Sequence, residues 1–429
     1  MKELSLLSLL FLVPHLFFAQ ERIYRQYATQ RVHQRLLAEN PDMADRLKQM
    51  ENHIAQFGDN PGSDSIAVIF HVLQGPNSLP IKEEEIYDQL DMLNRDFGPY
   101  EARKKEYKMD AVQALADRGV DMGIYFCLAD QDAQPVRYIQ TETDEWSMDD
   151  AIKKAEKGGA APHRPDRYLN IWVAELGEGI SGYAQMPGGP VHTDGIVIDQ
   201  SFFARGLPSY EKYYGKGVTL THLVGNYLGL YDLWNEETPC ADDKVADTPI
   251  HNSPNASPGA LNYHMSTCPG SPVEMSMNFM DNTDDGALTM FTPGQKRRVK
   301  ANLSAGGFRF SVADGTATRC GKDGLEEMID RSAMMGGNDT NSPDNNTLSI
   351  FPNPAKDEVF IAIQSTDEGL GKLSVFNSQG ILLLRRNEQL NKGNFQMNID
   401  CRNWPPGVYY IKVLFQDGSS LSENLTIDR

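Results

Sequence analysis

The chain has 429 residues, a length that is enough for two or three domains. It is acidic, with 59 aspartate and glutamate residues against 40 lysine and arginine residues. This balance argues against a nucleic-acid partner, because binding phosphates needs a positive surface. Inside the chain no apolar run reaches the ~18 residues that a membrane-spanning helix requires, so we expect no transmembrane segment.

Residues 1–19 have the pattern of a secretory signal peptide. Lys2 supplies a positive start, residues 4–18 are mostly apolar, and Ala19 is a small residue at a plausible cleavage point before Gln20. The alternative is a buried N-terminal helix, but the segment is short, terminal and followed at once by charges. We therefore expect export, and exported chains can hold disulfides. At least one of the five cysteines must stay unpaired within the chain: Cys127, Cys240, Cys268, Cys320 and Cys401.

Residues 20–62 are charged and are predicted to form a helical N-terminal arm or pro-segment. Apolar residues recur at three-to-four spacing across 38–57, which is typical of an amphipathic helix. Asn60 and Pro61 break this pattern, so we expect a separate unit to begin near residue 63.

Residues 63–312 alternate predicted strands with predicted helices. We expect strands at 65–72, 122–128, 168–175 and 194–198, and helices at 82–97 and 293–303. Residues 238–272 are rich in proline, asparagine, serine and aspartate and are predicted to be mostly loop.

The C-terminal part of the chain has a different character. Residues 313–346 are polar and rich in glycine, aspartate and asparagine, which favours a linker. Residues 347–429 contain short alternating runs punctuated by turns, a pattern typical of a small antiparallel β-sandwich.

The stretch 217–232 has the frame of a zinc-peptidase active-site helix. In the motif H-E-x-x-H-x-x-G-x-x-H, the three histidines bind zinc, the glycine turns the chain back, and the glutamate is the general base. The chain keeps the first histidine, His222, and the glycine, Gly229. The base position and the second and third ligand positions have changed, and they are now Leu223, Asn226 and Asp232.

Several segments in collinear order over about 65–305 resemble the pappalysin family of metzincin zinc peptidases. They are 66–72, 89–97, 168–173, 182–187, 194–198, 219–232, 240–249, 278–281 and 291–295. The resemblance implies an α/β domain in which a mixed twisted sheet and two long helices lie above a loop-rich lower half. The metal cleft lies between the two halves.

The resemblance also implies roles for residues outside this helix. Met280 matches the family's Met-turn, whose methionine forms an apolar floor under the metal. Cys240 and Cys268 match a disulfide of the lower half. A loop of similar proteins borders a calcium site, and calcium prefers carboxylate oxygens, although a solvated loop is the alternative. Asp247 lies in the matching segment, and Asp242 and Asp243 add carboxylates nearby.

Residues 350–355, 375–380, Gly393 and 406–411 resemble the sorting domain of type IX secretion cargo in Bacteroidetes. This resemblance implies a contact with the type IX secretion machinery. It also implies delivery to the outer-membrane surface or to the medium.

The chain departs from the family at the residues that perform the chemistry. Zinc accepts imidazole and carboxylate, so His222 and Asp232 could still bind it, but the neutral amide of Asn226 is a poor ligand. Leu223 cannot transfer protons, and loss of a positioned general base typically costs ~10²–10⁴ in rate. The Met-turn tyrosine, which in the family helps to stabilise the oxyanion, is replaced by Asn282.

The arm departs from the family as well. Tyr27 stands where similar proteins have a cysteine that blocks the zinc. We therefore expect zinc binding to be lost or weak. Other histidines could supply substitute ligands, although nothing in their spacing indicates it: His192, His251 and His264.

These observations support three hypotheses. The first is a secreted, catalytically inactive pseudopeptidase that binds peptides or proteins, with an extended peptide along the edge of the upper sheet. The second is an active metalloendopeptidase with an altered zinc site made of His222 and Asp232. The third is a surface-structural or adhesion protein.

Overall fold

A computed structural model describes residues 25–313 and 347–428 of the chain, apart from short gaps. The gaps are 59–61, 77, 106, 108, 131–132, 206–210, 236, 256–264, 271–272, 366–368, 378–381, 391 and 415–419. The predicted signal peptide, nearly all of the predicted linker and two of the singled-out residues, His264 and Cys320, lie outside the described part.

A six-stranded mixed sheet forms the centre of the N-terminal unit. Its main path is β2 (Ile124–Leu128), β1 (Asp64–Gln74), β4 (Leu169–Ala174), β6 (Ile196–Asp199) and β5 (Gly182–Ala184), and β3 (Val136–Gln140) also pairs with β1. All pairs are parallel except that of β5 with β6. The continuous apolar run of β1 is buried on both faces, as expected for a central parallel strand.

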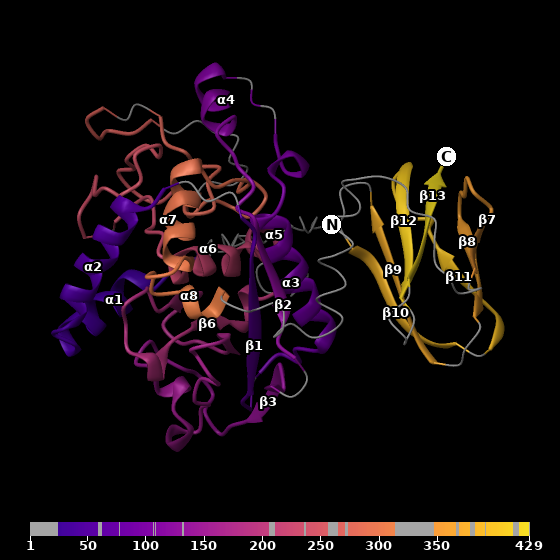
Figure 1. Cartoon of the computed structure of the whole chain (residues 1–429), viewed down its shortest axis with the longest axis horizontal. Coiled ribbons are helices and arrows are strands. Elements are labelled where there is room, and N and C mark those ends of the chain that lie inside the picture. The colour runs from indigo at the N-terminus through magenta and orange to yellow at the C-terminus, as the bar shows by residue number, and fades with distance from the viewer. Residues whose placement is uncertain are drawn as a thin grey trace, which may run out of the picture.

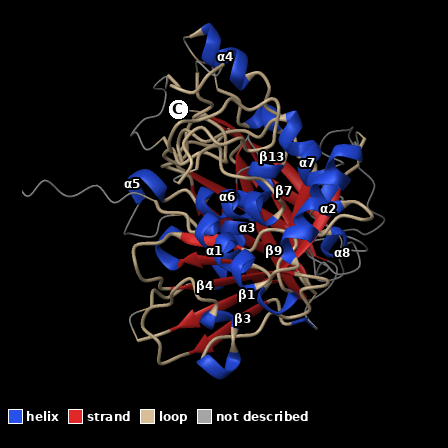
Figure 2. Cartoon of the chain, turned by 90° about the vertical axis from the view of Figure 1, so that its left-hand side faces the viewer, coloured by secondary structure: helices blue, strands red, loops and turns tan. Residues whose placement is uncertain are grey.

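Two helices pack against this sheet and enclose the main core. They are α3 (Glu83–Phe97) and α6 (Val218–Tyr227), which contact each other and lie near β1 and β4 in Figure 2. The loops between α6 and α7 (Pro293–Leu303) have no helix or strand in their described residues. Both views place many loops beside α4 (Asp110–Ala116) at one end of the unit (Figure 1). The α/β fold with a loop-rich half is therefore as the resemblance implied.

The arm consists of α1 (Thr29–Glu39) and α2 (Met43–Gln56), and α2 runs beside α7 (Figure 1). Both helices lie within the predicted helical arm, and the periodic stretch 38–57 corresponds to α2. The remaining short helices are α5 (Glu211–Tyr214) and α8 (Phe310–Ala313). Single 3₁₀ turns occupy Tyr100–Ala102, Ala151–Lys153, Ala155–Lys157, Val191–Thr193 and Gln200–Phe202.

The C-terminal unit consists of two antiparallel sheets around a core of their own. One sheet has the order β10 (Leu382–Leu390), β9 (Gly369–Asn377), β12 (Gly407–Leu414) and β13 (Ser420–Ile427). The other has the order β11 (Gly393–Asp400), β8 (Glu358–Ser365) and β7 (Thr347–Phe351). Two facing sheets with a shared apolar core form the predicted small β-sandwich.

Candidate functional site

Helix α6 is wholly buried, and its C-terminal turn brings distant residues together. The helix ends at Tyr227, and Gly229 follows with a φ of +100°. A Cβ at Gly229 would lie only 2.2 Å from Nδ2 of Asn302, so both the conformation and the space require glycine. The turn sends the chain back along the helix and places Asp232 against His222.

The His222 ring lies between two acceptors. Its Nδ1 is 2.9 Å from the carbonyl oxygen of Phe279, and its Nε2 is 2.9 Å from Oδ1 of Asp232. A carbonyl and an ionised carboxylate can only accept, so both bonds form together when each ring nitrogen carries a proton. The nitrogen that would face a metal in a zinc peptidase is thus paired with a carboxylate.

The carboxylate of Asp232 has three hydrogen-bond partners. Besides His222, its Oδ1 accepts from Nδ2 of Asn226 at 2.8 Å, and its Oδ2 accepts from Nε2 of Gln30 at 3.0 Å. Asn226 Nδ2 also donates to the carbonyl of Leu230 at 3.1 Å. These two acceptors fix the amide orientation, because a flipped amide would turn its oxygen toward both of them.

This arrangement does not fit zinc. A catalytic zinc site normally has three protein ligands and an open position. Here the two good ligands, His222 and Asp232, are bonded to each other, and Asn226 presents its NH₂ group to the same centre. Among the described residues, no group of three or more His, Cys, Asp or Glu side chains is placed to hold a metal ion.

The position of the general base belongs to the apolar core. Leu223 is fully buried, and a Cβ on Gly182 would lie 2.7 Å from its Cδ1 atom. No proton carrier therefore faces the centre from this turn of the helix.

The arm lies directly on this centre and pairs with β5 through main-chain hydrogen bonds. Tyr27 forms a parallel bridge with Gly182 of β5, the Ala28 N–H donates to the Gly182 carbonyl, and the Ser181 N–H donates to the Gln26 carbonyl, each at 2.9 Å. The Tyr27 ring stacks on His222 with centroids 3.7 Å apart and planes 8° apart. Burial raises the pKa of the Tyr27 phenol, so this ring remains neutral.

Arg25 fills the space next to the former oxyanion position. It is 1% exposed, and its guanidinium lies near the rings of Tyr27 and Tyr214. It donates to Oδ1 of Asn282 at 3.2 Å and forms a fully buried ion pair with Asp285 at 2.6 Å. Asn282, in turn, donates from Nδ2 to the carbonyl of Arg25 at 3.0 Å. No local sequence signal indicates that these residues meet.

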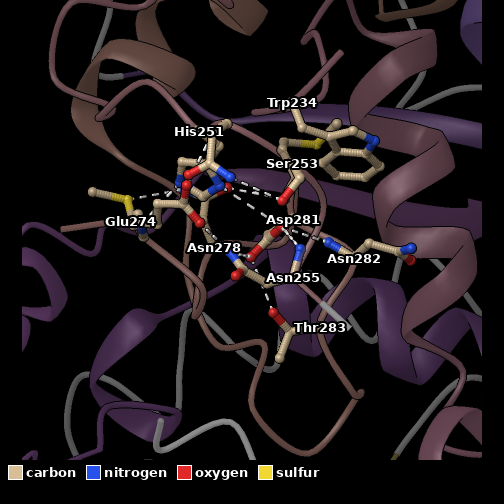
Figure 3. A network of polar contacts seen from close by, with 12 residues as sticks. Trp234, His251, Ser253, Asn255, Glu274, Asn278, Asp281, Asn282 and Thr283 are labelled. Atoms are coloured by element: carbon tan, nitrogen blue, oxygen red, sulfur yellow. Dashed lines mark hydrogen bonds and ion pairs between the residues drawn. The ribbon is translucent and has the colours of Figure 1, made fainter. Parts of the chain in front are cut away.

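The Met-turn lies beneath α6, and a second buried polar network surrounds it. A Cβ on Gly225 would lie 2.5 Å from the sulfur of Met280, so this methionine is in close contact with the helix. Figure 3 shows Asp281 among donors from several loops. Its two oxygens accept from the backbone N–H and Nδ2 of Asn255, and Nδ2 also donates to Glu274 at 3.0 Å.

Two of the histidines considered as substitute ligands are accounted for. His251 is fully buried, its Nε2 accepts from the N–H of Met275 at 2.9 Å, and its Nδ1 lies 3.8 Å from Oδ1 of Asp281. His192 is exposed. Neither is bonded to His222.

Each acid of the predicted calcium loop accepts hydrogen bonds from different partners. Asp242 accepts from the N–H of Lys244, Asp243 accepts from the hydroxyl of Thr248, and Asp247 accepts from the Thr292 hydroxyl and the Gly294 N–H at the start of α7. Burial raises the pKa of Asp243 to about 7. The three carboxylates therefore lend no support to a shared calcium site.

The disulfide implied for the lower half is present. Cys240 and Cys268 are bonded, with their Cα atoms 5.6 Å apart. Cys127 is also disulfide-bonded, and Cys401 is buried in the C-terminal core.

Comparison with known proteins identifies both units. Residues 160–304 match the model of the pregnancy-associated plasma protein-A peptidase family, and residues 349–428 match that of the secretion system C-terminal sorting domain. An extracellular metalloprotease of Arthroderma gypseum is 30% identical over 268 residues, which are 60% of this chain and 79% of the relative. The chain belongs to the pappalysin family of metallopeptidases.

Solved structures agree with this assignment. Mirolysin in complex with a small compound is 32% identical, with a TM-score of 0.52 over 61% of this chain and 99% of that one. A promirolysin mutant from Tannerella forsythia is 30% identical, with a TM-score of 0.59 over 69% of this chain and 99% of that one. The sorting domain directs this pappalysin-family chain by type IX secretion to the cell surface or the extracellular space. None of the helices among the described residues is long and apolar enough to cross a membrane.

Proposed function

We propose that this protein is a secreted pappalysin-family pseudopeptidase, which holds an extended peptide in its cleft and does not hydrolyse it. The observation that carries the proposal is the contact of His222 Nε2 with Asp232, on the same carboxylate that accepts from Asn226. These bonds use the atoms that would otherwise bind the metal.

The residues around this centre support the absence of hydrolysis. Hydrolysis by a metal-bound water requires a base that accepts the water's proton and passes it to the leaving amine. Leu223 offers no such group, and its side chain packs in the apolar core. The Met-turn position, Asn282, is occupied in binding both the side chain and the carbonyl of Arg25.

The peptide-holding half of the proposal is supported by main-chain pairing at β5. The main-chain groups of Ser181 and Gly182 pair with residues 26–28, a short segment that comes from outside the sheet. Such pairing depends on backbone groups and does not require a catalytic centre.

Metal analysis together with a digestion assay tests this function. Purified protein, loaded with zinc and then desalted, is expected to keep much less than about one zinc per chain, and to leave casein and a peptide library uncut. Stoichiometric zinc together with chelator-sensitive cleavage would overturn the proposal and favour the altered zinc site of His222 and Asp232.

A further inference from the structure

We infer that the arm, residues 25–58, is a permanent part of the secreted protein, and that residues 25–30 are the peptide that fills its cleft. The inference deepens the proposed function, on which it rests, by naming the occupant of the cleft. It follows from where the arm touches the domain, from the charge that it buries and from the core that it shares.

The arm contacts the positions at which the peptidase pattern has changed. Tyr27 stacks on His222, the histidine that has lost its partner histidines. Gln30 donates to the Asp232 carboxylate and, at 2.9 Å, to the carbonyl of Trp234. Arg25 and Asn282 exchange two hydrogen bonds.

Leu223, at the position of the general base in the motif, packs on the side of Gly182 opposite the arm. Leu223 packs under Gly182, and Gly182 is the residue that pairs with Tyr27 and Ala28. The changed residues therefore form a docking surface for the arm in place of a metal centre.

Arg25 supplies a charge that the domain needs. The side chains of Arg25 and Asp285 are both fully buried, and the guanidinium also donates to the Thr283 carbonyl at 2.6 Å and the Thr219 hydroxyl. Departure of the arm would leave the Asp285 carboxylate buried with only backbone donors such as the Lys216 N–H. An uncompensated buried charge is strongly destabilising.

The two arm helices complete apolar cores of the domain. One apolar cluster contains Trp172, Leu176 and Tyr183 of the domain. The arm adds Ala28 before α1, Val32 and Leu36 of α1, and Met43 at the start of α2 to this cluster. Met50 and Ile54 of α2 form another cluster with Ala301 of α7. Removal of the arm would expose these faces to water.

An ion pair ties α2 to the turn that shapes the site. Glu51 accepts from both terminal nitrogens of Arg298 at 2.6 and 3.0 Å, and Arg298 also donates to the Gly229 carbonyl at 2.7 Å. The arm thus contacts the cleft through Tyr27. Through Glu51 it also holds Arg298 in place against the end of α6.

Cutting the chain between the arm and the domain, without removing either piece, tests the inference directly. A specific protease site is inserted between Gly58 and Gly62 of the full chain, and the purified protein is cut there. Size-exclusion chromatography then shows whether the two pieces stay together, and the melting temperature is measured. We expect the arm to co-elute with the domain under native conditions and to separate only on unfolding. Release of the arm from a domain that stays folded, with an unchanged melting temperature, would overturn the inference.

Matched variants of the cut protein identify the anchoring residue. In Arg25→Ala, we expect the arm to dissociate roughly 100-fold faster or more, because the buried ion pair is broken. The control Lys48→Ala removes an exposed cation of the same arm and should leave dissociation unchanged. Equal dissociation of the Arg25 variant and the unsubstituted cut protein contradicts the inference.

The N-terminus of protein secreted by its own host gives a second readout. Intact-mass analysis is expected to place it before Arg25, and an N-terminus near residue 58 or later contradicts retention. Neither readout depends on zinc or on peptide cleavage. Hydrolytic activity with the arm retained would therefore overturn the proposed function alone, and loss of the arm without activity would overturn this inference alone.

Discussion

His222 and His251 are both fully buried and both lie beside a carboxylate. They belong to two hydrogen-bond networks whose residues come from different parts of the chain. His222 faces acceptors at both ring nitrogens and touches arm residues that are almost 200 positions away. His251 accepts from a backbone N–H and lies next to Asp281, within a network whose acids and amides come from positions 251–283. The first network depends on the arm, whereas the second is largely assembled from one loop region.

The difference separates a network built from one loop region from a centre that joins distant parts of the chain. The Met-turn network connects the loop-rich half through local amide–carboxylate bonds, which need no metal. The α6 centre, by contrast, takes partners from the arm. Changes at the two networks should therefore have separable effects on metal binding, arm docking and stability.

The largest expected effect is the recovery of zinc binding. The triple variant Leu223→Glu, Asn226→His and Asp232→His restores three imidazoles and a base on the retained glycine turn, so we predict about one zinc per chain by elemental analysis. Leu223→Glu alone is the control and should bind none. Failure of the triple variant to take up zinc would show that this cleft does not have pappalysin geometry.

The next largest effect is expected at the arm anchor. Arg25→Ala leaves Asp285 buried without its cation, and we predict a loss of about 3–5 kcal/mol in urea unfolding followed by tryptophan fluorescence. Asp285→Asn in the Arg25→Ala background should recover part of this loss, since it removes the unpaired charge. A loss no greater than that of Lys48→Ala would mean that the buried pair contributes nothing.

A smaller effect is expected in the Met-turn network. Asn255→Ala removes the amide that donates to both Glu274 and Asp281, and we predict a loss of about 1–3 kcal/mol in the same unfolding assay. Lys157→Ala, at an exposed position outside this network, is the control. Retention of the arm in the cut protein should not change, and faster release of the arm would show that the two networks are coupled.

The smallest effect is expected from Tyr27→Phe. The Tyr27 hydroxyl is buried and has no hydrogen-bond partner among the described residues, so its removal should leave stability unchanged or raise it by up to about 1 kcal/mol. Tyr27→Ala, in contrast, removes the ring that stacks on His222 and should release the arm faster. A marked loss in the phenylalanine variant would reveal a role for the hydroxyl.

Local signals account for the parts of the fold that the sequence predicted well. Helix α7 begins and ends where expected, because Pro293 occupies its first turn and Thr292 and Gln295 form a capping box. Strand β1 was predictable from its apolar run, and the turn after α6 from Gly229. The predicted strand from residue 194 begins at Ile196, two residues later than expected.

The missed parts lack such local signals. Strand β5 has three residues, which is too short for a periodic pattern, and its pairing with the arm depends on main-chain groups alone. The pair of Arg25 with Asp285 spans 260 positions, and nothing near either residue indicates the other. Sequence reasoning predicted which positions depart from the family's catalytic motif, but it did not show that the arm contacts them.

The close packing of Leu223 under Gly182 restricts which residues position 223 can accept. A glutamate there would place a carboxylate in the apolar layer that supports Tyr27. Burial of an unpaired charge costs stability, so this substitution alone would weaken the fold. Under the proposed function, selection for stability is enough to retain the leucine.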